Sequence, residues 1–325
     1  MRDSHCCPSS AAHHYISALN VLTLPDQGII RLVAEIIACL NYGKLCPMKD
    51  STKLPDLRML ATESLLPHED SDPRRVEKLS QRIKEEGRLK NPPIVSQIPG
   101  SDNYVILDGA NRVMAFVTLG IPHMVAQIVS YADTGVELDT WYHVVAGMEF
   151  DEFDHALTSI TGLDLLECSL EEARFALKTN QAAAYIISEH GVRKACSPTG
   201  ERLNDVHLLQ GIVGAYRGKA DIFRASNDNW AIQKPFYPNI TALVVFPSYR
   251  PADILQTVRN GDKVPSGITR HLIPQRALNI NIPLEVLAAD WDLERKCAWL
   301  DNWLMERMAA NAIRYYAEST FSFDE

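Results

Sequence analysis

The sequence has few of the features that mark membrane, secreted or disulfide-rich proteins. It contains no apolar run of about 20 residues, so no transmembrane helix is expected. The N-terminus, MRDSHCCPSSAAHH, lacks the basic and then apolar pattern of a signal peptide. The seven cysteines are too few for a disulfide scaffold, none are spaced as CxxC, and their odd number fits a reducing compartment. We therefore expect a cytoplasmic protein.

Several standard motifs for nucleotides and metals are also missing. No GxGxxG, no HExxH and no kinase HRD or DFG triplet occurs. Gly214 and Gly218-Lys219 fall short of a P-loop, because Ala220 stands where a hydroxyl residue is required. The sequence thus gives no support for a dinucleotide fold, a P-loop, a zincin or a protein kinase.

Charge limits the choice of partner. Lysine and arginine number 32 against 41 aspartates and glutamates, a net charge of −9. A chain this acidic is a poor general ligand for DNA or anionic membranes. The cations between residues 74 and 90 are interleaved with glutamates, which is typical of a solvated helix face. With 46% hydrophobic residues, the 325-residue chain suits one large domain or two modest ones.

The apolar pattern predicts a compact α/β module at residues 56–147. Strands are expected at 57–62, 92–98, 104–108 and 123–131, the second and third forming a hairpin. A charged helix is expected to begin after Asp72, with Pro73 in its first turn, and to stop at Gly87. A second helix follows Gly109 and ends at Gly120.

Other elements are expected on both sides of this module. Residues 1–55 form an N-terminal extension with one helix at 26–40, and residues 148–288 form a second α/β domain. That domain is expected to hold strands at 163–168, 183–188 and 241–247 and helices at 170–178, 201–217 and 251–260. Residues 289–325 carry a C-terminal helix, expected at 290–316, whose tryptophans would pack on the body or on a second subunit. The fold class is α/β (α+β) with added terminal helices, and a homodimer is a candidate assembly.

The segment Val105–Arg112 gives the clearest indication of chemistry. A buried strand ends at Asp108-Gly109 and passes directly into a helix. The first amides of that helix have no partner within it, the helix dipole adds positive potential, and Arg112 contributes a guanidinium. A phosphate would bind well there. The alternative is a tight turn in which Asp108 caps the helix and Arg112 forms a surface ion pair.

Two further segments carry polar side chains suited to a reaction. A glutamate in the loop Pro67-His68-Glu69-Asp70, just before a helix, can act as a general base or hold Mg²⁺. In the strand that Thr269-Arg270-His271 enters, alternation sends Thr269 and His271 to one face and Arg270 to the other. Such a trio suits phosphate or carboxylate recognition. The alternatives without chemistry are a solvated acidic loop and a charged strand edge.

Together these segments resemble the free L-serine kinases. LLPHED, a charged helix, NPPIV, YVILDGANRVMAFVTLGI, TWYHVVAG and, much later, ITRHLIP occur in the order typical of that family, over about residues 57–288. The resemblance implies a ParB/sulfiredoxin-like nucleotide-binding module, followed by a second domain that contributes the Thr-Arg-His motif. It also implies phosphoryl transfer from ATP or ADP to L-serine with Mg²⁺, giving O-phospho-L-serine. The family includes an archaeal ADP-dependent enzyme and a siderophore-cluster relative.

The resemblance implies roles for individual residues. Glu69 matches the glutamate proposed to deprotonate the serine hydroxyl. The loop that would bind the nucleotide phosphates consists of Asp108, Gly109, Ala110, Asn111 and Arg112. The substrate contacts would come from His68, Trp141, Thr269, Arg270 and His271. Archaeal members carry two histidines where this chain has Ala110-Asn111, and asparagine does not titrate near neutral pH, so the choice between ATP and ADP is open.

Other functions give different expectations. A ParB-like regulator that senses a nucleotide or ligand and binds DNA would need a basic cluster, which the residues after the module lack. A sulfiredoxin would need a cysteine where Ala110 stands. The sequence does not distinguish a serine kinase from a kinase of another small amino-acid alcohol, because one methylene group changes the free energy of binding in a pocket by only about 1–3 kcal/mol.

Overall fold

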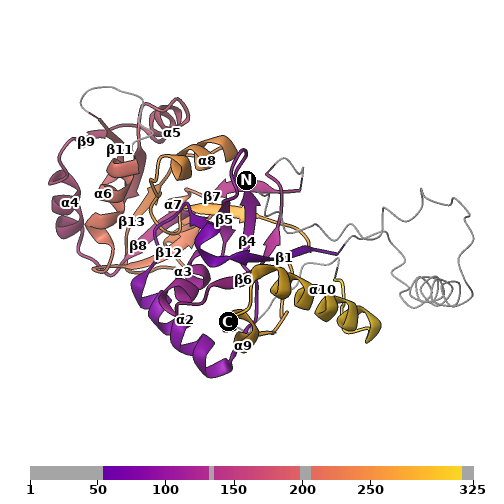
Figure 1. Cartoon of the computed structure of the whole chain (residues 1–325). Coiled ribbons are helices and arrows are strands. Elements are labelled where there is room, and N and C mark those ends of the chain that lie inside the picture. The colour runs from indigo at the N-terminus through magenta and orange to yellow at the C-terminus, as the bar shows by residue number, and fades with distance from the viewer. Residues whose placement is uncertain (1–53, 132–134, 198–205, 317–325) are drawn as a thin grey trace, which may run out of the picture.

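The computed structural model describes residues 54–131, 135–197 and 206–316 (Figure 1). The helix expected at 26–40 and the first residues of the one expected at 201–217 lie outside these ranges. The strands are β1 (Asp56–Ala61), β2 (Leu65–Pro67), β3 (Arg88–Leu89), β4 (Ile94–Gln97), β5 (Tyr104–Asp108), β6 (His123–Ile128), β7 (Glu137–Thr140), β8 (Tyr142–Ala146), β9 (Asp164–Glu167), β10 (Ala184–Ser188), β11 (Gly191–Cys196), β12 (Asp221–Ala225), β13 (Ile240–Val245), β14 (Thr269–Leu272) and β15 (Ile282–Pro283). The helices are the 3₁₀ turn η1 (Thr62–Ser64), α2 (Pro73–Glu86), α3 (Ala110–Thr118), α4 (Phe150–Thr158), α5 (Leu170–Lys178), α6 (Val206–Tyr216), α7 (Trp230–Gln233), α8 (Pro251–Arg259), α9 (Leu284–Ala288) and α10 (Leu293–Ala309).

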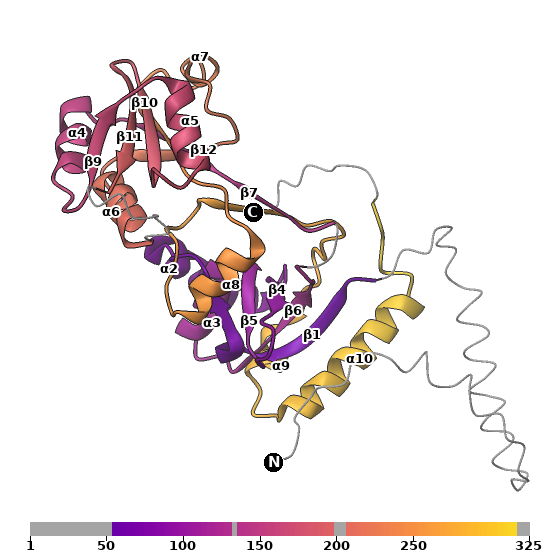
Figure 2. The same ribbon diagram turned by 90° about the horizontal axis from the view of Figure 1, so that it is seen from above.

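Two main sheets form the two lobes visible in Figure 2. Within the described residues, the first sheet has the strand order β1-β6-β4-β5-β2 and the second has β12-β8-β13-β10-β11-β9. Strand β5 pairs antiparallel with β4, as the expected hairpin requires, and parallel with β2. Because β2 and β5 run in the same direction, the loops that follow them start at the same edge of the sheet. The first sheet is therefore mixed and the second is antiparallel, and together with their helices they confirm the expected α/β (α+β) fold class.

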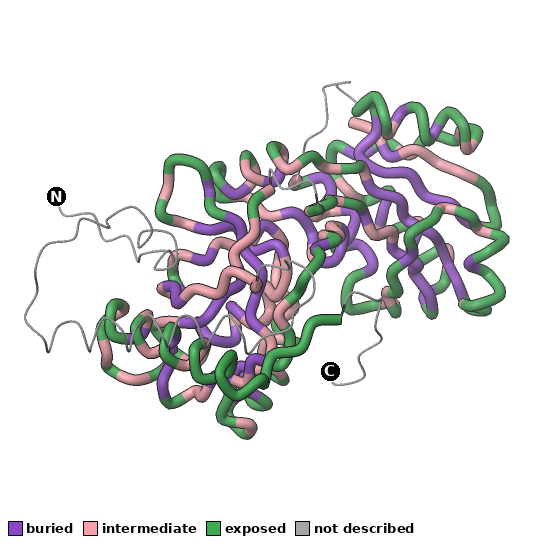
Figure 3. The backbone as a smooth tube through the Cα atoms, turned by 90° about the vertical axis from the view of Figure 1, so that its right-hand side faces the viewer, coloured by how far each residue is buried: buried purple, intermediate pink, exposed green. Residues whose placement is uncertain are grey.

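Alternating side chains of the first sheet enter two cores. Val95 and Ile106 pack in a core with residues of α2, α3 and α10, whereas Ile94 and Val105 pack in a core with residues of α8. The sheet is therefore buried on both faces, which explains its nearly continuous apolar strands. In Figure 3 buried segments run through the interior of both lobes.

Helix α2 begins and ends where its sequence signals predict. The Asp72 side chain accepts hydrogen bonds from the backbone amides of Arg74 and Arg75, at 3.0 and 3.4 Å. Gly87 ends the helix in the left-handed conformation, with φ 61°. Helix α2 is thereby fixed beside α3, between the loop after β2 and strand β3.

Some expected elements differ from the structure. Helix α10 ends at Ala309 instead of reaching 316, and Asn311 follows in the left-handed conformation, φ 50°, that commonly terminates helices. Strand β2 was not predicted, and its last residue, Pro67, was expected in a loop, because three residues are too few to show a strand period. The predicted division of the chain at 147/148 stays a prediction, although β8 already lies in the second sheet and α8 packs on the first.

No helix within the described residues combines the length and the apolar character needed to cross a bilayer.

Candidate active site

The expected site residues line one pocket, of about 600 Å³, at the sheet edge where β2 and β5 end. All of the residues singled out from the sequence are in its lining: His68, Glu69, Asp108, Gly109, Ala110, Asn111, Arg112, Trp141, Thr269, Arg270 and His271. The fold thus brings together segments that are up to about 200 residues apart in the chain.

The Glu69 carboxylate is held by the backbone at the start of β14. Its Oε2 atom accepts a hydrogen bond from the Gly267 amide at 3.0 Å, and Oε1 accepts one from the Thr269 amide at 2.8 Å. The Thr269 hydroxyl also contacts Oε1. Since a carboxylate has about four lone-pair positions, these three contacts leave one, on Oε2, for a substrate hydroxyl.

Gly267 is required at its position for two reasons. Its φ of 84° is left-handed, and a Cβ atom there would lie 2.9 Å from Nη2 of Arg224. The Arg224 guanidinium therefore lies directly over the peptide that orients Glu69. Arg224 projects from β12 of the second sheet, so both lobes contribute to the pocket.

His68 is buried, with 3% of its surface exposed. Its Nδ1 atom lies 2.6 Å from the Ile106 carbonyl oxygen and its Nε2 atom 2.8 Å from the Thr269 hydroxyl. Burial lowers the pKa of His68, which favours the neutral ring. Because a carbonyl only accepts hydrogen bonds, Nδ1 carries the ring proton. His68 would therefore influence a bound ligand mainly through Thr269.

His271 is also neutral and held inside the protein. The Tyr131 hydroxyl lies 2.7 Å from its Nε2 atom, and the ring hydrogen-bonds the backbone of Leu107. Burial lowers the pKa of His271 to about 3. Both ring nitrogens are engaged, so the side chain fixes β14 against β5 instead of presenting a donor to the pocket.

Arg270 projects to the opposite side from its neighbours. Its guanidinium stacks on the Trp141 ring, 4.2 Å from the centroid, and lies 3.5 Å from an Asp139 carboxylate oxygen. Thr269 and His271 both contact His68 instead. The alternation expected for the Thr-Arg-His strand is confirmed, and it places the Arg270–Trp141 pair as one wall of the pocket.

The Asp108–Arg112 loop is built around a glycine. Gly109 occupies the N-cap position of α3 with φ 90°, and a Cβ atom there would lie 2.7 Å from Nη2 of Arg112. Arg112 folds back over this glycine and donates to Asp108 at 2.9 Å. Of the alternative, the Asp108 cap is wrong, because Gly109 is the N-cap residue and the Asp108 carboxylate accepts from Arg112, whereas the expected Arg112 ion pair is present, partly buried and not on the surface. Asn111 accepts a hydrogen bond from the Asp72 amide at 3.2 Å and so joins the starts of α2 and α3.

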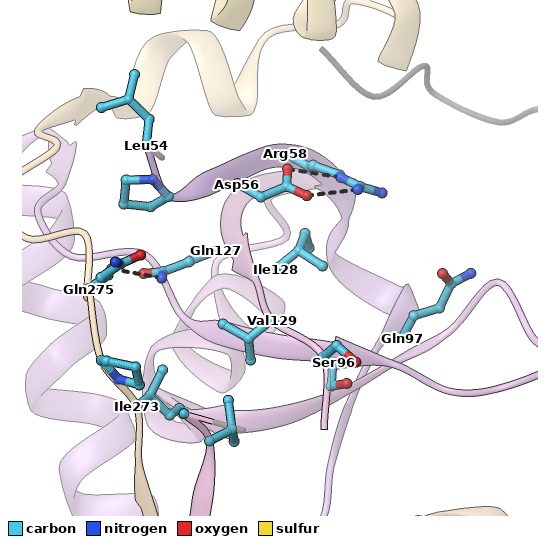
Figure 4. A pocket seen from close by; sticks show the side chains of 15 residues that line it. Leu54, Asp56, Arg58, Ser96, Gln97, Gln127, Ile128, Val129, Ile273 and Gln275 are labelled. Carbon is cyan, nitrogen blue, oxygen red and sulfur yellow. Dashed lines mark hydrogen bonds and ion pairs between the residues drawn. The ribbon is translucent and has the colours of Figure 1, made fainter. Parts of the chain in front are cut away.

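Arg276 belongs to the site but was not found from the sequence. It contacts the same Asp108 oxygen as Arg112. Its position depends on Gln127, a buried residue of β6. The Gln127 side chain donates a hydrogen bond to the Gln275 carbonyl at 3.0 Å and accepts one from the Ala277 backbone amide at 2.8 Å. Gln275 is held in the left-handed conformation, with φ 53°. Figure 4 shows the Gln127–Gln275 bond at the rim of a second cavity, of about 480 Å³, which none of the predicted site residues line.

The main pocket is strongly cationic, although the whole chain is acidic. The cations in its lining are Arg75, Arg82, Arg88, Lys90, Arg112, Arg224, Arg270 and Arg276. The carboxylates are Glu69, Asp70, Glu86 and Asp108. Eight positive and four negative side chains give an excess that favours an anionic ligand such as a nucleotide.

Comparison with known proteins gives consistent relatives. No family model matches the chain. The ATP-dependent L-serine kinase of Staphylothermus marinus is 25% identical over 233 residues, covering 70% of this chain and 90% of the relative. The ATP-dependent L-serine kinase SbnI of Staphylococcus aureus is 25% identical over 277 residues, covering 83% and 97%. The ADP-dependent L-serine kinase SerK of Thermococcus kodakarensis is 22% identical over 238 residues, covering 73% and 95%.

Solved structures agree on the fold. A free serine kinase in complex with AMP superposes with a TM-score of 0.63 at 20% identity, covering 73% of this chain and 95% of that one. C-terminally truncated SbnI gives a TM-score of 0.63 at 19% identity, covering 77% and 96%. The expected resemblance is confirmed: the chain is similar, over most of their length, to proteins named as free L-serine kinases, and it shares their fold.

Proposed function

We propose that the protein phosphorylates the hydroxyl group of free L-serine, with ATP or ADP as phosphoryl donor, to give O-phospho-L-serine. The observation that carries this proposal is the Glu69 carboxylate, oriented by two backbone amides and facing the same pocket as the Asp108–Arg112 loop. A base and an anion-binding loop in one pocket are the two parts that transfer to an alcohol requires. The relatives named as L-serine kinases support this choice of acceptor.

The pocket offers distinct surfaces to the two substrates. The start of α3, with Arg112 and Arg276, would bind the nucleotide phosphates through helix amides and guanidinium groups. Apolar side chains of Leu79, Ile83 and Leu89 line the part of the pocket along α2, and we assign the nucleotide base to them. The amino acid would lie beside Glu69, between Trp141 and the Thr269–His271 strand.

Glu69 would act as the general base. Phosphoryl transfer depends mainly on positioning and charge neutralisation, and the base must lie within hydrogen-bond reach of the attacking hydroxyl. The lone pair left on Oε2 is the position we assign to the serine hydroxyl. His68 and Thr269 would keep the carboxylate in this orientation, whereas Arg270 would face the substrate from the Trp141 side.

Magnesium fits this arrangement as a partner of the nucleotide. No group of three or more metal-binding side chains occurs among the described residues, but Mg²⁺ is usually held by one or two carboxylates together with substrate phosphates. Asp108 could supply such a carboxylate through Oδ1, because the hydrogen bonds from Arg112 and Arg276 both go to its Oδ2 atom. A bound Mg²⁺ would neutralise charge on the phosphates.

A DNA-binding regulator finds no specific support in the geometry. Arg75 and Arg82, on the basic face of α2, line the ligand pocket. Cations that serve a pocket are not arranged as a continuous DNA-binding surface. The cytoplasmic location and the homodimer stay predictions, as does the choice between serine and a related amino-acid alcohol.

The proposal is tested by product analysis on purified protein. The protein is incubated with Mg²⁺, with ATP or ADP, and with L-serine, L-threonine or L-homoserine in separate reactions. Mass spectrometry then measures each phosphorylated amino acid. We expect O-phosphoserine as the main product with at least one nucleotide. A larger rate with threonine or homoserine would change the assigned substrate, and no product with any pair would contradict the proposal.

A further inference from the structure

The hydroxyl of Thr269 has one proton and two acceptors. Its oxygen lies 2.8 Å from Nε2 of His68 and also contacts Oε1 of Glu69. Since Nδ1 of His68 donates to the Ile106 carbonyl at 2.6 Å, Nε2 of the neutral ring can only accept. An ionised carboxylate is also only an acceptor. The hydroxyl can therefore satisfy only one of these two neighbours at a time.

We propose that Thr269 is a hydroxyl switch that couples the protonation of Glu69 to His68. While Glu69 is ionised, the hydroxyl donates to its Oε1 atom, because hydrogen bonds to charged acceptors are about twice as strong as neutral ones. When Glu69 is protonated, Oε1 becomes a weaker acceptor and the hydroxyl turns to Nε2 of His68. The inference rests on the proposed role of Glu69 as base.

The switch accounts for the proton during the reaction. The substrate hydroxyl gives its proton to Oε2 of Glu69 while its oxygen bonds to the terminal phosphorus of the nucleotide. The bond between that phosphorus and the bridging oxygen breaks, and its electron pair leaves with the shortened nucleotide. The proton stays on Glu69 until solvent removes it, and no proton passes to His68. Thr269 and His68 are thus positioning residues: the Thr269 hydroxyl stabilises the ionised carboxylate, and His68, by accepting that hydroxyl after proton transfer, offsets part of the cost of holding the proton on Glu69.

Other titratable groups face this triad without taking part in the switch. His271 lies edge-on to the His68 ring, with centroids 5.3 Å apart, and burial keeps it neutral. Tyr249 is close enough to Glu69 for the carboxylate to raise the pKa of its hydroxyl further, in addition to the larger effect of burial. Arg224 lies over Gly267, and Asp70 is adjacent in sequence. None of these groups is substituted in the variants below.

The test follows the Glu69 carboxyl directly by ¹³C NMR in protein labelled at glutamate, with the signal assigned by loss in E69Q. Thr269→Val removes the donor to the ionised form, so the titration midpoint of Glu69 should rise by on the order of one pH unit. Thr269→Ser should restore it. His68→Asn keeps a donor for the Ile106 carbonyl but has no atom at the Nε2 position. It should lower the midpoint, because the protonated form loses the acceptor for the Thr269 hydroxyl.

The double variant separates the switch from ordinary structural effects. In the Thr269→Val background, His68→Asn should cause no further shift, because the two residues act through one hydroxyl. Equal shifts in both backgrounds, or an unchanged midpoint in Thr269→Val, would overturn the proposal.

If His68→Asn does not fold, the ¹⁵N signal of His68 Nε2 in the unsubstituted protein replaces this measurement. That signal should report a new hydrogen bond as Glu69 is protonated, and it should not do so in Thr269→Val.

These measurements need no substrate. A failure to form phosphoserine would therefore count against the proposed function alone, whereas additive NMR shifts would count against the switch alone.

Discussion

The rings of His68 and His271 lie edge to face, with centroids 5.3 Å apart and planes at 85°. His68 bonds the backbone of Ile106, and His271 bonds the backbone of Leu107, the next residue of β5. Two motifs about 200 residues apart are thereby fixed to the strand that leads into the Asp108–Arg112 loop. This contact joins the carboxylate, the anion-binding loop and the Thr-Arg-His strand into one site.

The first prediction concerns the crowding at Gly109. Gly109→Ala combines a left-handed φ of 90° with a Cβ atom 2.7 Å from Arg112, so Arg112 must move. Gly100→Ala is the matched control, because Gly100 has a φ of 76° but nothing within 4 Å of its Cβ position. Both variants should lose about 1–2 kcal/mol of stability. Only Gly109→Ala should also weaken nucleotide binding, by about tenfold or more in calorimetry. Equal nucleotide affinity in the two variants would count against the loop.

The second prediction concerns Arg276 and its support. Arg276→Ala removes one of two guanidinium groups at Asp108 and should weaken nucleotide binding about 10- to 100-fold, since hydrogen bonds to charged groups contribute about 1.5–3 kcal/mol. Gln127→Leu should have a smaller effect in the same direction, because it releases the turn at Gln275. Arg295→Ala, on α10 and outside the pocket, is the control. Unchanged affinity in Arg276→Ala would exclude it from the site.

The third prediction concerns Arg224, whose guanidinium has no carboxylate partner among the described residues and lies beside the Glu69 loop. We expect it to bind the carboxylate of the amino acid. Arg224→Gln should therefore raise the KM for L-serine about tenfold or more while changing the rate with L-serinamide, which lacks that charge, by much less. Lys219→Gln, an exposed cation in the preceding turn, should behave like the unsubstituted protein. An equal loss with both substrates would indicate a structural effect instead.

The fourth prediction concerns stability at acid pH. Burial lowers the pKa of His143 to about 4 and that of His271 to about 3, from 6.5. Below pH 6.5 these two histidines therefore bind more protons in the unfolded chain than in the folded one, so their contribution to stability falls as pH decreases and is level above about pH 7. Each such histidine contributes a slope of up to about 1.4 kcal/mol per pH unit.

Urea unfolding between pH 7 and 5 measures this slope. His143→Gln should reduce the slope of stability against pH by up to about 1.4 kcal/mol per pH unit, the value for one proton. His155→Gln, on the exposed side of α4, should leave the slope unchanged. An identical slope in His143→Gln would show that its burial does not set the acid sensitivity.

Sequence patterns predicted most of the residues that line the candidate pocket, because these residues lie in local motifs. A strand followed by Asp-Gly and a helix, and a Thr-Arg-His strand with its alternation, both keep their local geometry in the fold. Arg224 and Arg276 could not be found this way. One is a lone cation in a short strand and the other lies in an irregular segment, and only tertiary packing brings them to the pocket. The capping role considered for Asp108 fails because its carboxylate pairs with two arginines, of which only Arg112 is near in the sequence.

The most direct test of the account replaces Glu69 by glutamine, which keeps the shape of the side chain but removes its basicity. Phosphoserine formation is measured alongside nucleotide affinity, with Glu77→Gln, an exposed residue of α2, as the control. We predict that kcat falls by about 10²–10⁴-fold in Glu69→Gln while nucleotide affinity stays within a few fold. A loss of activity below tenfold, with nucleotide binding intact, would contradict the assignment of Glu69 as the base.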